Sequence, residues 1–179
     1  MKYIYLIRHC EADGQAFEAT LTETGIKQAN DLDNFFVEKR VERIISSPYK
    51  RAVQSIQPLA ERLKLDIELE DRLTERVLSS KNLPDWYEKL QETFEDFDLK
   101  FDGGESSHEA MNRIVEVIEE VVQSTPDNVA IVTHGNLMAL LLKHFHQEFS
   151  FNDWKKLSNP DVYLLKYQNY QTTFKRIWK

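Results

Sequence analysis

The amino-acid sequence predicts an α/β fold: a three-layer αβα sandwich with a mostly parallel central sheet, helices on both faces and an antiparallel edge strand. Short apolar runs alternate along the chain with segments of helical periodicity, which is typical of parallel strands joined by helices. The chain ends in two strand-like segments, 161–167 and 172–178, which we expect to form a hairpin through Asn169. This hairpin would supply the antiparallel edge.

The first half of the chain is expected to hold strands at 3–7, 44–46 and 66–69 and helices at 22–37 and from 48 onward. Thr22 precedes the first helical segment, and its hydroxyl can accept a hydrogen bond from a free backbone N–H of the first turn. Ser47 and Pro48 predict the next helix start, with Ser47 as N-cap and Pro48 at the first helical position.

The second half is expected to hold helices at 83–97, 107–121, 136–146 and 151–157 and a strand at 129–133. Ser106 and Glu109 have the spacing of a capping box at the start of the long helix. The apolar stripe from Trp86 to Phe97 is interpreted first as a packing face and second as the lining of a substrate cleft.

Length and composition favour a single-domain protein and argue against nucleic-acid and membrane partners. A chain of 179 residues without an interdomain linker is expected to form a single domain, 1–179. Its net charge of −7 and its lack of a Lys/Arg cluster argue against nucleic acid as a partner. Cys10 is the only cysteine, and the apolar runs are shorter than a signal peptide core or a bilayer span. We therefore expect a cytoplasmic protein without a membrane partner; the sequence leaves its oligomeric state open.

Polar residues with phosphate-binding chemistry follow three of the predicted strands. Arg8 and His9 follow the first strand, Arg51 comes shortly after the second, and His134 with Gly135 follows the strand at 129–133. Ligands of open α/β folds bind at the carboxyl ends of the strands, where these residues would meet. Two guanidinium groups and the N–H groups of the helix that starts at Gly135 suit a phosphoryl group.

This set also suits nucleophilic catalysis. Nearby arginines keep an imidazole neutral, so that its lone pair can attack phosphorus. The pattern of residues does not decide which histidine attacks. For the acid that protonates the leaving oxygen, Glu75 is the best-placed candidate, while Glu11 and Asp13 lie closer to His9 in sequence. No Cys/His cluster has the spacing of a zinc site.

The ordered series of motifs resembles the histidine phosphatase superfamily, which includes the cofactor-dependent phosphoglycerate mutases. The matching blocks are Arg8-His9-Cys10, Leu21-Thr22-x-x-Gly25-x-x-Gln28-Ala29, Ser46-Ser47-Pro48 with Arg51-Ala52, Arg72-Leu73-Thr74-Glu75, Gly104-Glu105-Ser106, Thr133-His134-Gly135 and Asn159-Pro160. A single Arg-His pair would carry no weight, but this order of blocks along most of the chain is specific.

The resemblance implies that His9 is the nucleophile and forms a phosphohistidine. It implies that Arg8, Arg51 and His134 bind the phosphoryl group, and that Glu75 protonates the leaving oxygen and then activates water. Gln15 stands where the family often has an amide that contacts phosphate. No metal or organic cofactor is implied, and the expected partners are a phosphorylated small molecule and inorganic phosphate.

The chain departs from the family pattern in two places. Cys10 replaces the usual glycine, and we expect it to be a small packed side chain rather than a nucleophile. The residues after Glu75 lack the Gly-x-Trp-Glu-Gly stretch of many members. The segment 76–102 is expected to be a substrate-side insertion or cap that differs from the family pattern.

Hydrolysis of a phosphate monoester is the favoured activity, and phosphoglycerate mutase is the alternative. Arg76 resembles the mutases, but the segment 77–102 contains no arginine to hold a second anionic group. If this segment walls the pocket, its acids would repel such a group; these are Asp85, Glu88, Glu92, Glu95 and Asp96. A protein phosphatase of the same family stays open, and a non-catalytic phospho-ligand module is disfavoured because binding does not need Glu75.

Overall fold

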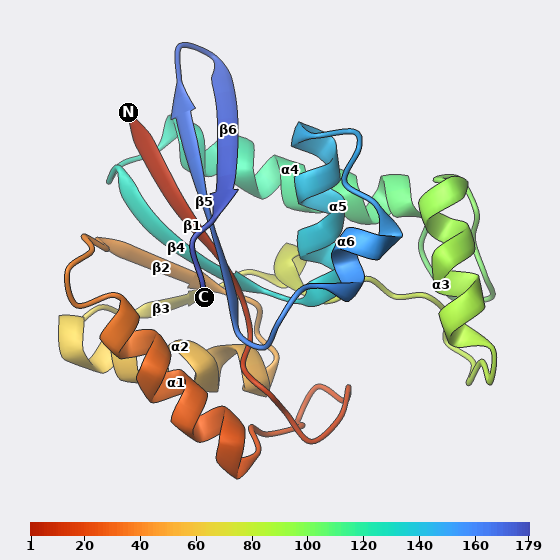
Figure 1. Ribbon diagram of the computed structural model, residues 1–179, viewed down its shortest axis with the longest axis horizontal. Coiled ribbons are helices and arrows are strands. Elements are labelled where there is room, and N and C mark those ends of the chain that lie inside the picture. Colours follow the sequence, from red (N-terminus) through yellow and green to blue (C-terminus); the bar gives the residue numbers. More distant parts are fainter.

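The computed structural model describes residues 1–179, and its centre is a six-stranded sheet in the order β3-β2-β4-β1-β5-β6 (Figure 1). The strands are β1 (Lys2–Arg8), β2 (Arg43–Ser46), β3 (Ile67–Leu69), β4 (Asn128–Thr133), β5 (Asp161–Gln168) and β6 (Gln171–Arg176). The first four run parallel, whereas β5 is antiparallel to β1 and β6 is antiparallel to β5. The predicted mostly parallel sheet with an antiparallel edge is confirmed.

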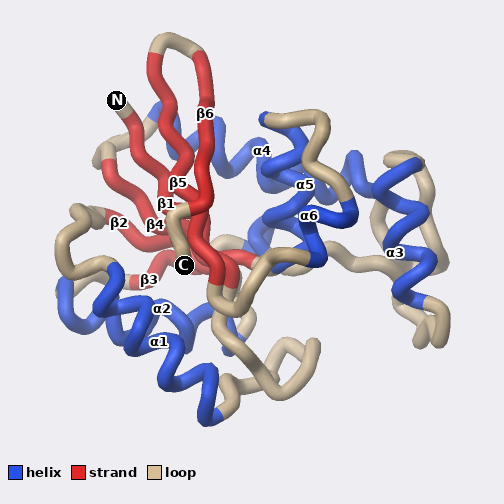
Figure 2. The backbone as a smooth tube through the Cα atoms, viewed as in Figure 1, coloured by secondary structure: helices blue, strands red, loops and turns tan.

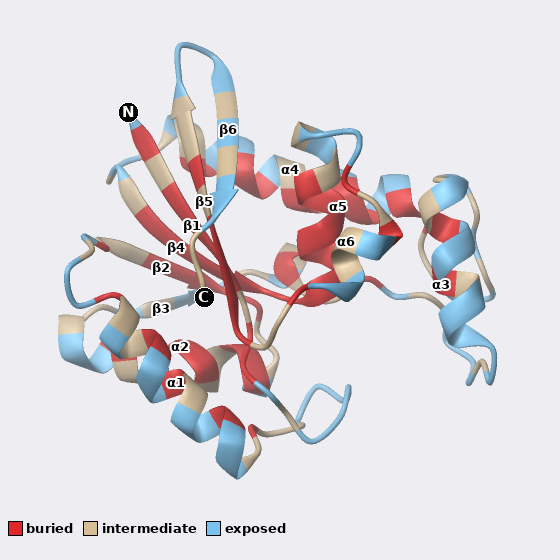
Figure 3. Ribbon diagram, in the orientation of Figure 1, coloured by how far each residue is buried: buried red, intermediate tan, exposed pale blue.

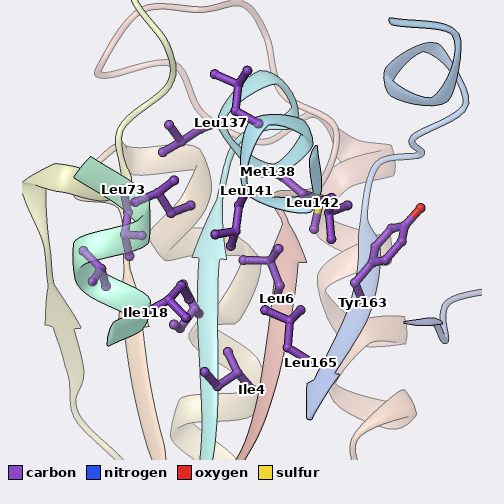
Figure 4. Packing of buried hydrophobic residues seen from close by; sticks show 14 of the residues in the cluster. Ile4, Leu6, Leu73, Ile118, Leu137, Met138, Leu141, Leu142, Tyr163 and Leu165 are labelled. Carbon is purple, nitrogen blue, oxygen red and sulfur yellow. The ribbon is translucent and has the colours of Figure 1, made fainter. Parts of the chain in front are cut away.

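Helices cover both faces of the sheet, as the predicted sandwich requires. The helices are α1 (Glu23–Phe35), α2 (Lys50–Leu63), α3 (Trp86–Glu95), α4 (Ser107–Gln123), α5 (Gly135–Phe145) and α6 (Phe151–Lys155), with a 3₁₀ turn at Asp71–Leu73. One apolar cluster joins α1 and α2 to the sheet, and a larger one joins α4 and α5 to the opposite face. Figure 4 shows Leu141 and Leu142 of α5 beside Leu6 of β1. Helix α5 is buried along most of its length (Figure 3).

The strand register brings the ends of three parallel strands to one place. Arg8 of β1 pairs with Thr133 of β4, and Ser46 of β2 pairs with Val132 of β4. The pairing continues one residue further, since the His9 N–H donates to the carbonyl of Thr133 at 3.1 Å. Residues that follow β1, β2 and β4 therefore lie side by side at one edge of the sheet.

The helix starts confirm two of the three predicted caps. The Thr22 hydroxyl accepts from the Gly25 N–H at 2.9 Å, and Ser106 and Glu109 form the capping box at the start of α4. The third prediction is wrong, because α2 begins at Lys50 with Tyr49 at the N-cap position. The hairpin between β5 and β6 turns as predicted at Asn169, where φ is 52° and the left-handed region favours asparagine.

The segment 76–102 extends away from the sheet, with α3 at the edge of the molecule (Figure 1). Long loops lead to and from this helix, and another connects β1 to α1 (Figure 2). Phe94 and Phe97 pack against the larger core cluster and anchor the segment. Gly104 lets the returning chain pass close to the outgoing one, because a Cβ there would lie 2.1 Å from the carbonyl oxygen of Leu78. None of the helices has the length and apolar character needed to cross a bilayer.

Candidate active site

A cavity of about 560 Å³ opens where the ends of β1, β2 and β4 meet the segment 76–102. It is lined by Arg8, Gln15, Tyr49, Arg51, Glu75, Arg76, Val77, Leu78, Ser79, Trp86, Leu90, Asn136 and Trp154. The rings of His9 and His134 lie directly behind this lining, with their centroids 5.0 Å apart. Residues from three strand exits therefore converge on one space, as predicted.

Arg51 joins the two histidines. Its Nε lies 3.3 Å from Nε2 of His9, and its Nη2 lies 3.3 Å from Nδ1 of His134. The side chain is 1% exposed, and its Nη1 donates to the backbone carbonyl of Ala16 at 2.9 Å. The ring of Tyr49 lies under the guanidinium, 4.8 Å from its centre. Arg51 is thus fixed from every side in the floor of the cavity.

The hydrogen bonds of His9 define its tautomer. Nδ1 lies 2.7 Å from the carbonyl oxygen of Cys10, which can only accept, so Nδ1 carries the proton. The lone pair therefore resides on Nε2, which faces Arg51. Burial first, and then the charges of Arg51 and Arg8, lower the pKa of His9 to about 4, against the opposing effect of the hydrogen bond to Cys10. His9 is consequently a neutral imidazole with an available lone pair at neutral pH.

His134 has the opposite tautomer. Its Nδ1 accepts from Arg51, so Nε2 carries the proton and donates to the hydroxyl of Ser47 at 2.8 Å. Burial first, and then His9 and Arg51, hold the pKa of His134 well below its usual value. The Ser47 hydroxyl also accepts from the Tyr49 N–H at 3.3 Å, but this bond lies ahead of α2, which begins only at Lys50, so Ser47 does not cap the helix. Ser47 was not predicted as a site residue.

Arg8 and Gly135 are fitted to each other. The Arg8 Nη1 donates to the carbonyl of Leu157 at 3.1 Å, and its Nε is buried without a protein partner. A Cβ at position 135 would lie 2.8 Å from both Cζ and Nε of Arg8. Only glycine leaves room for this guanidinium at the start of α5. The side-chain oxygen of Asn136, the next residue, is the second buried polar atom without a partner.

Glu75 is the carboxylate in the cavity lining. One of its oxygens accepts from the N–H groups of Arg76 and Leu137 at 2.8 and 2.9 Å, and the other from Asn136 at 3.1 Å. The carboxylate therefore sits on the positive end of α5. The alternative acid Glu11 is exposed and accepts from the Thr22 hydroxyl at 2.8 Å, and neither it nor Asp13 lines the cavity.

The backbone that carries Glu75 is held by Arg113 of α4. Arg113 donates from Nη1 to the carbonyls of Arg72 and Thr74 at 2.7 and 2.8 Å, and from Nη2 to that of Glu75 at 3.2 Å. Arg113 is itself fixed by a bidentate pair with Glu105, at 3.0 and 2.9 Å. The end of the 3₁₀ turn and the irregular residues that follow it are thereby bound to a long helix.

Gln15 and Cys10 lie in different surroundings. Gln15 is exposed on the loop after β1 and lines the cavity, and its carbonyl accepts from Arg51 at 3.3 Å. Cys10 is fully buried against Leu21 and Ala29, and burial raises the pKa of its thiol to about 11. Such a thiol is packed and unreactive.

The segment 76–102 walls the cavity, but not with its acids. It contributes Arg76, Val77, Leu78, Ser79, Trp86 and Leu90. The predicted acidic wall is wrong: Asp85, Glu88, Glu92, Glu95 and Asp96 are exposed and do not line the cavity. The reason is the orientation of α3, whose buried face holds Leu90 and Thr93 and turns its acids to solvent. The Trp86–Phe97 stripe therefore both packs and lines the cavity.

Arg76 does not offer its charge to the cavity. The side chain is 5% exposed, and Nε and Nη2 donate to the carbonyl of Glu105 at 3.2 and 2.9 Å. Its Nη1 donates to the hydroxyl of Thr93 at 3.4 Å and to the hydroxyl of Ser107 at 3.2 Å. Arg76 directly follows Glu75, as in the mutases, but its guanidinium bonds to residues of α3 and α4 instead of facing the cavity.

Tyr49, Asn136 and Trp154 also line the cavity and were not predicted. Tyr49 and Asn136 lie within two residues of Arg51 and Gly135 in the sequence, and this closeness is the only sequence feature that could have indicated them as site residues. Trp154 comes from α6, where nothing in the sequence pointed to the cavity.

The curated relatives of this chain include two proteins named as phosphoserine phosphatases. A putative phosphoserine phosphatase 2 of Hydrogenobacter thermophilus is 27% identical over 154 residues, or 77% of this chain and 75% of the relative. Phosphoserine phosphatase 1 of the same organism is 29% identical over 150 residues, or 75% and 71% of the two chains.

Two solved structures share the fold. A mycobacterial glucosyl-3-phosphoglycerate phosphatase in complex with inorganic phosphate superposes with a TM-score of 0.80 at 23% identity, covering 99% of this chain and 96% of that one. Phosphoserine phosphatase from Entamoeba histolytica, in complex with 3-phosphoglyceric acid, gives 0.79 at 18% identity, covering 100% and 98%.

The decisive match is to a whole family. The family model described as histidine phosphatase superfamily (branch 1) matches residues 4–179. The match includes every strand exit described above, from Arg8 to Gly135. The chain is therefore a member of the histidine phosphatase superfamily.

Proposed function

We propose that this protein is a phosphatase that hydrolyses phosphate monoesters through a phosphohistidine on His9. The observation that carries the proposal is the tautomer of His9: the Cys10 carbonyl holds the proton on Nδ1 and leaves the Nε2 lone pair on the side of Arg51. The family assignment and the phosphatase names of the curated relatives support the same activity.

The reaction follows in two steps. In the first, Nε2 of His9 forms a bond to phosphorus, the bond from phosphorus to the ester oxygen breaks, and protonated Glu75 gives its proton to the departing oxygen. In the second, Glu75 takes a proton from water, the water oxygen bonds to phosphorus, and the bond to Nε2 breaks. Inorganic phosphate leaves, and His9 and Glu75 return to their starting states.

The phosphoryl group is bound by Arg8, Arg51 and His134, with the Gly135 N–H at the positive end of α5. Phosphoryl transfer depends mainly on positioning and on charge at the oxygens. The buried, unpaired Nε of Arg8 supports this role, because a buried N–H donor without a partner is costly unless a ligand pairs it. The Gln15 amide joins from the loop after β1.

Hydrolysis is preferred to mutase activity because of the segment 76–102, which we propose to be a substrate-side cap of one domain, 1–179. Its one arginine, Arg76, is bonded within the protein. Small phosphorylated molecules are the proposed substrates, in line with the names of the relatives and with a net charge of −7, which disfavours nucleic acid. The low cysteine content is compatible with a cytoplasmic site of action.

An assay with p-nitrophenyl phosphate tests the proposal. We expect hydrolysis without added metal, unchanged by a chelator and abolished in His9→Ala. His144→Ala removes an exposed histidine of α5 and serves as the matched control with full activity. Full activity in His9→Ala would refute the assignment.

A further inference from the structure

The cavity has two chemically different ends. Arg8, Arg51 and Glu75 line the cavity near the strand ends. The segment 76–102 and α6 contribute a mainly apolar wall of Val77, Leu78, Trp86, Leu90 and Trp154, with Ser79 as its one hydroxyl side chain. Trp86 and Val77 are 49% and 44% exposed although they are large apolar side chains. Trp154 is held flat against Phe151, with ring centroids 5.2 Å apart and an angle of 24° between the planes. Exposed apolar side chains gathered at a cavity mark a binding surface.

No unpaired cationic side chain lines the apolar wall. Arg8 and Arg51 stand at the phosphoryl end beside the histidines, and Arg76 has its guanidinium turned into the protein. The lysines of the segment, Lys81, Lys89 and Lys100, do not line the cavity and are paired with Asp102, Asp85 and Glu109. A carboxylate on the leaving group would therefore lose water without gaining a counter-charge, which is unfavourable.

We infer that the preferred substrates are phosphate monoesters of neutral, apolar alcohols that carry an aromatic ring or a branched alkyl group. This inference rests on the proposed hydrolysis at His9. The cavity volume of about 560 Å³ lies within the range of small-molecule pockets, about 300–1,000 Å³. The phosphoryl group binds at the arginines, and the apolar part of the alcohol packs on Trp86 and Trp154. Phosphoserine and phosphoglycerate, whose leaving groups carry charge, are poor substrates.

The test compares esters of primary alcohols, so that the leaving oxygen is of one kind. We expect kcat/KM for 2-phenylethyl phosphate to exceed that for O-phosphoserine and 3-phosphoglycerate about ten-fold or more, because a single methylene in an apolar pocket is already worth about ten-fold. Equal or reversed kcat/KM values would overturn the inference. Loss of hydrolysis for all three esters, or its survival in His9→Ala, would instead refute the proposed function.

Variants of the wall separate packing from reactivity. Trp86→Ala should raise KM for 2-phenylethyl phosphate about ten-fold and leave KM for phosphoserine unchanged. Tyr170→Ala is the control, since Tyr170 is an exposed aromatic side chain that does not line the cavity. Val77→Lys adds a cation at an exposed position of the wall and should increase kcat/KM for phosphoserine. An unchanged preference in both Trp86→Ala and Val77→Lys would contradict the inference.

Discussion

Arg113 donates a hydrogen bond to the backbone carbonyl of Glu75, at 3.2 Å, from a helix that begins more than thirty residues later in the chain. The same guanidinium holds the carbonyls of Arg72 and Thr74, and the Leu73 carbonyl accepts from the Thr133 hydroxyl at 2.7 Å. Every carbonyl from 72 to 75 is thus bound by a side chain of another element. The proposed acid is positioned by these contacts rather than by a helix or strand of its own.

Arg113→Gln should therefore weaken proton donation by Glu75. We expect kcat for an alkyl phosphate to fall about 10- to 100-fold, within the contribution of a general acid, and kcat for p-nitrophenyl phosphate to fall less. Arg72→Gln is the control: it removes a guanidinium of the same segment that pairs with Glu70 and Glu120 on the surface. Equal losses with both substrates, or the same effect in Arg72→Gln, would show that Arg113 has only a structural role.

Glu75→Gln keeps the shape of the side chain and removes the transferable proton. The loss of kcat/KM should be about 10²- to 10⁴-fold for alkyl phosphates and much smaller for p-nitrophenyl phosphate, whose leaving group needs no proton. In this background Arg113→Gln should add little to the loss, because both changes act on one group. A leaving-group dependence equal to that of the wild type would mean that Glu75 is not the acid.

Gly135→Ala should disturb the phosphoryl site through Arg8. The new Cβ would lie 2.8 Å from the guanidinium, so Arg8 must move away. We expect inorganic phosphate to inhibit the variant much more weakly, together with a stability loss of about 1–3 kcal/mol from overpacking. Inhibition constants and urea unfolding measure the two effects separately. Phosphate inhibition equal to that of the wild type would contradict the fit between these residues.

Burial of His9 should make the protein less stable in mild acid. The pKa of His9 falls to about 4 in the folded protein, below its ordinary value of 6.5. Between these two pH values the unfolded chain binds a proton that the folded protein does not, so stability falls as the pH is lowered from 6.5 to 4. The loss from His9 amounts to roughly 3 kcal/mol and ends near pH 4.

His9→Asn is the matched variant for this effect, since the asparagine amide can still donate to the Cys10 carbonyl and does not titrate. Urea unfolding at pH 7 and pH 4.5 should give a smaller acid-induced loss in the variant than in the wild type. His134, whose pKa is also lowered by burial, keeps part of the effect in the variant. Parallel losses in the two proteins would contradict the lowered pKa of His9.

The sequence predicts those parts of the site that depend on strand ends. Arg8, His9, Arg51 and His134 could be placed together because parallel strands in a sheet present their carboxyl ends at one edge. The register of β1, β2 and β4 then brings them into contact, as Arg8 opposite Thr133 illustrates. Local caps at Thr22 and Ser106 were equally accessible, since they depend on neighbours within one turn.

The predictions that were wrong or missing concern residues whose positions depend on contacts between elements distant in the sequence. Ser47 has the sequence of an N-cap, but its hydroxyl pairs with His134, which follows β4, and the helix begins only at Lys50. The acids of α3 could not be assigned to a face without knowing that Phe94 and Phe97 anchor the segment on the core. Trp154 reaches the cavity because α6 packs against α3, where Phe151 contacts Tyr87 and Phe94, and periodicity in the sequence does not reveal this contact.

The most direct test of the central claim is to trap the phosphorylated enzyme. Glu75→Gln, whose second step is slowed, is mixed with ³²P-labelled p-nitrophenyl phosphate, quenched in alkali and mapped by mass spectrometry. We expect an acid-labile, alkali-stable phosphoryl group on His9 that is absent from the double variant His9→Asn, Glu75→Gln. A label on His134, or continued hydrolysis without labelled histidine, would contradict it.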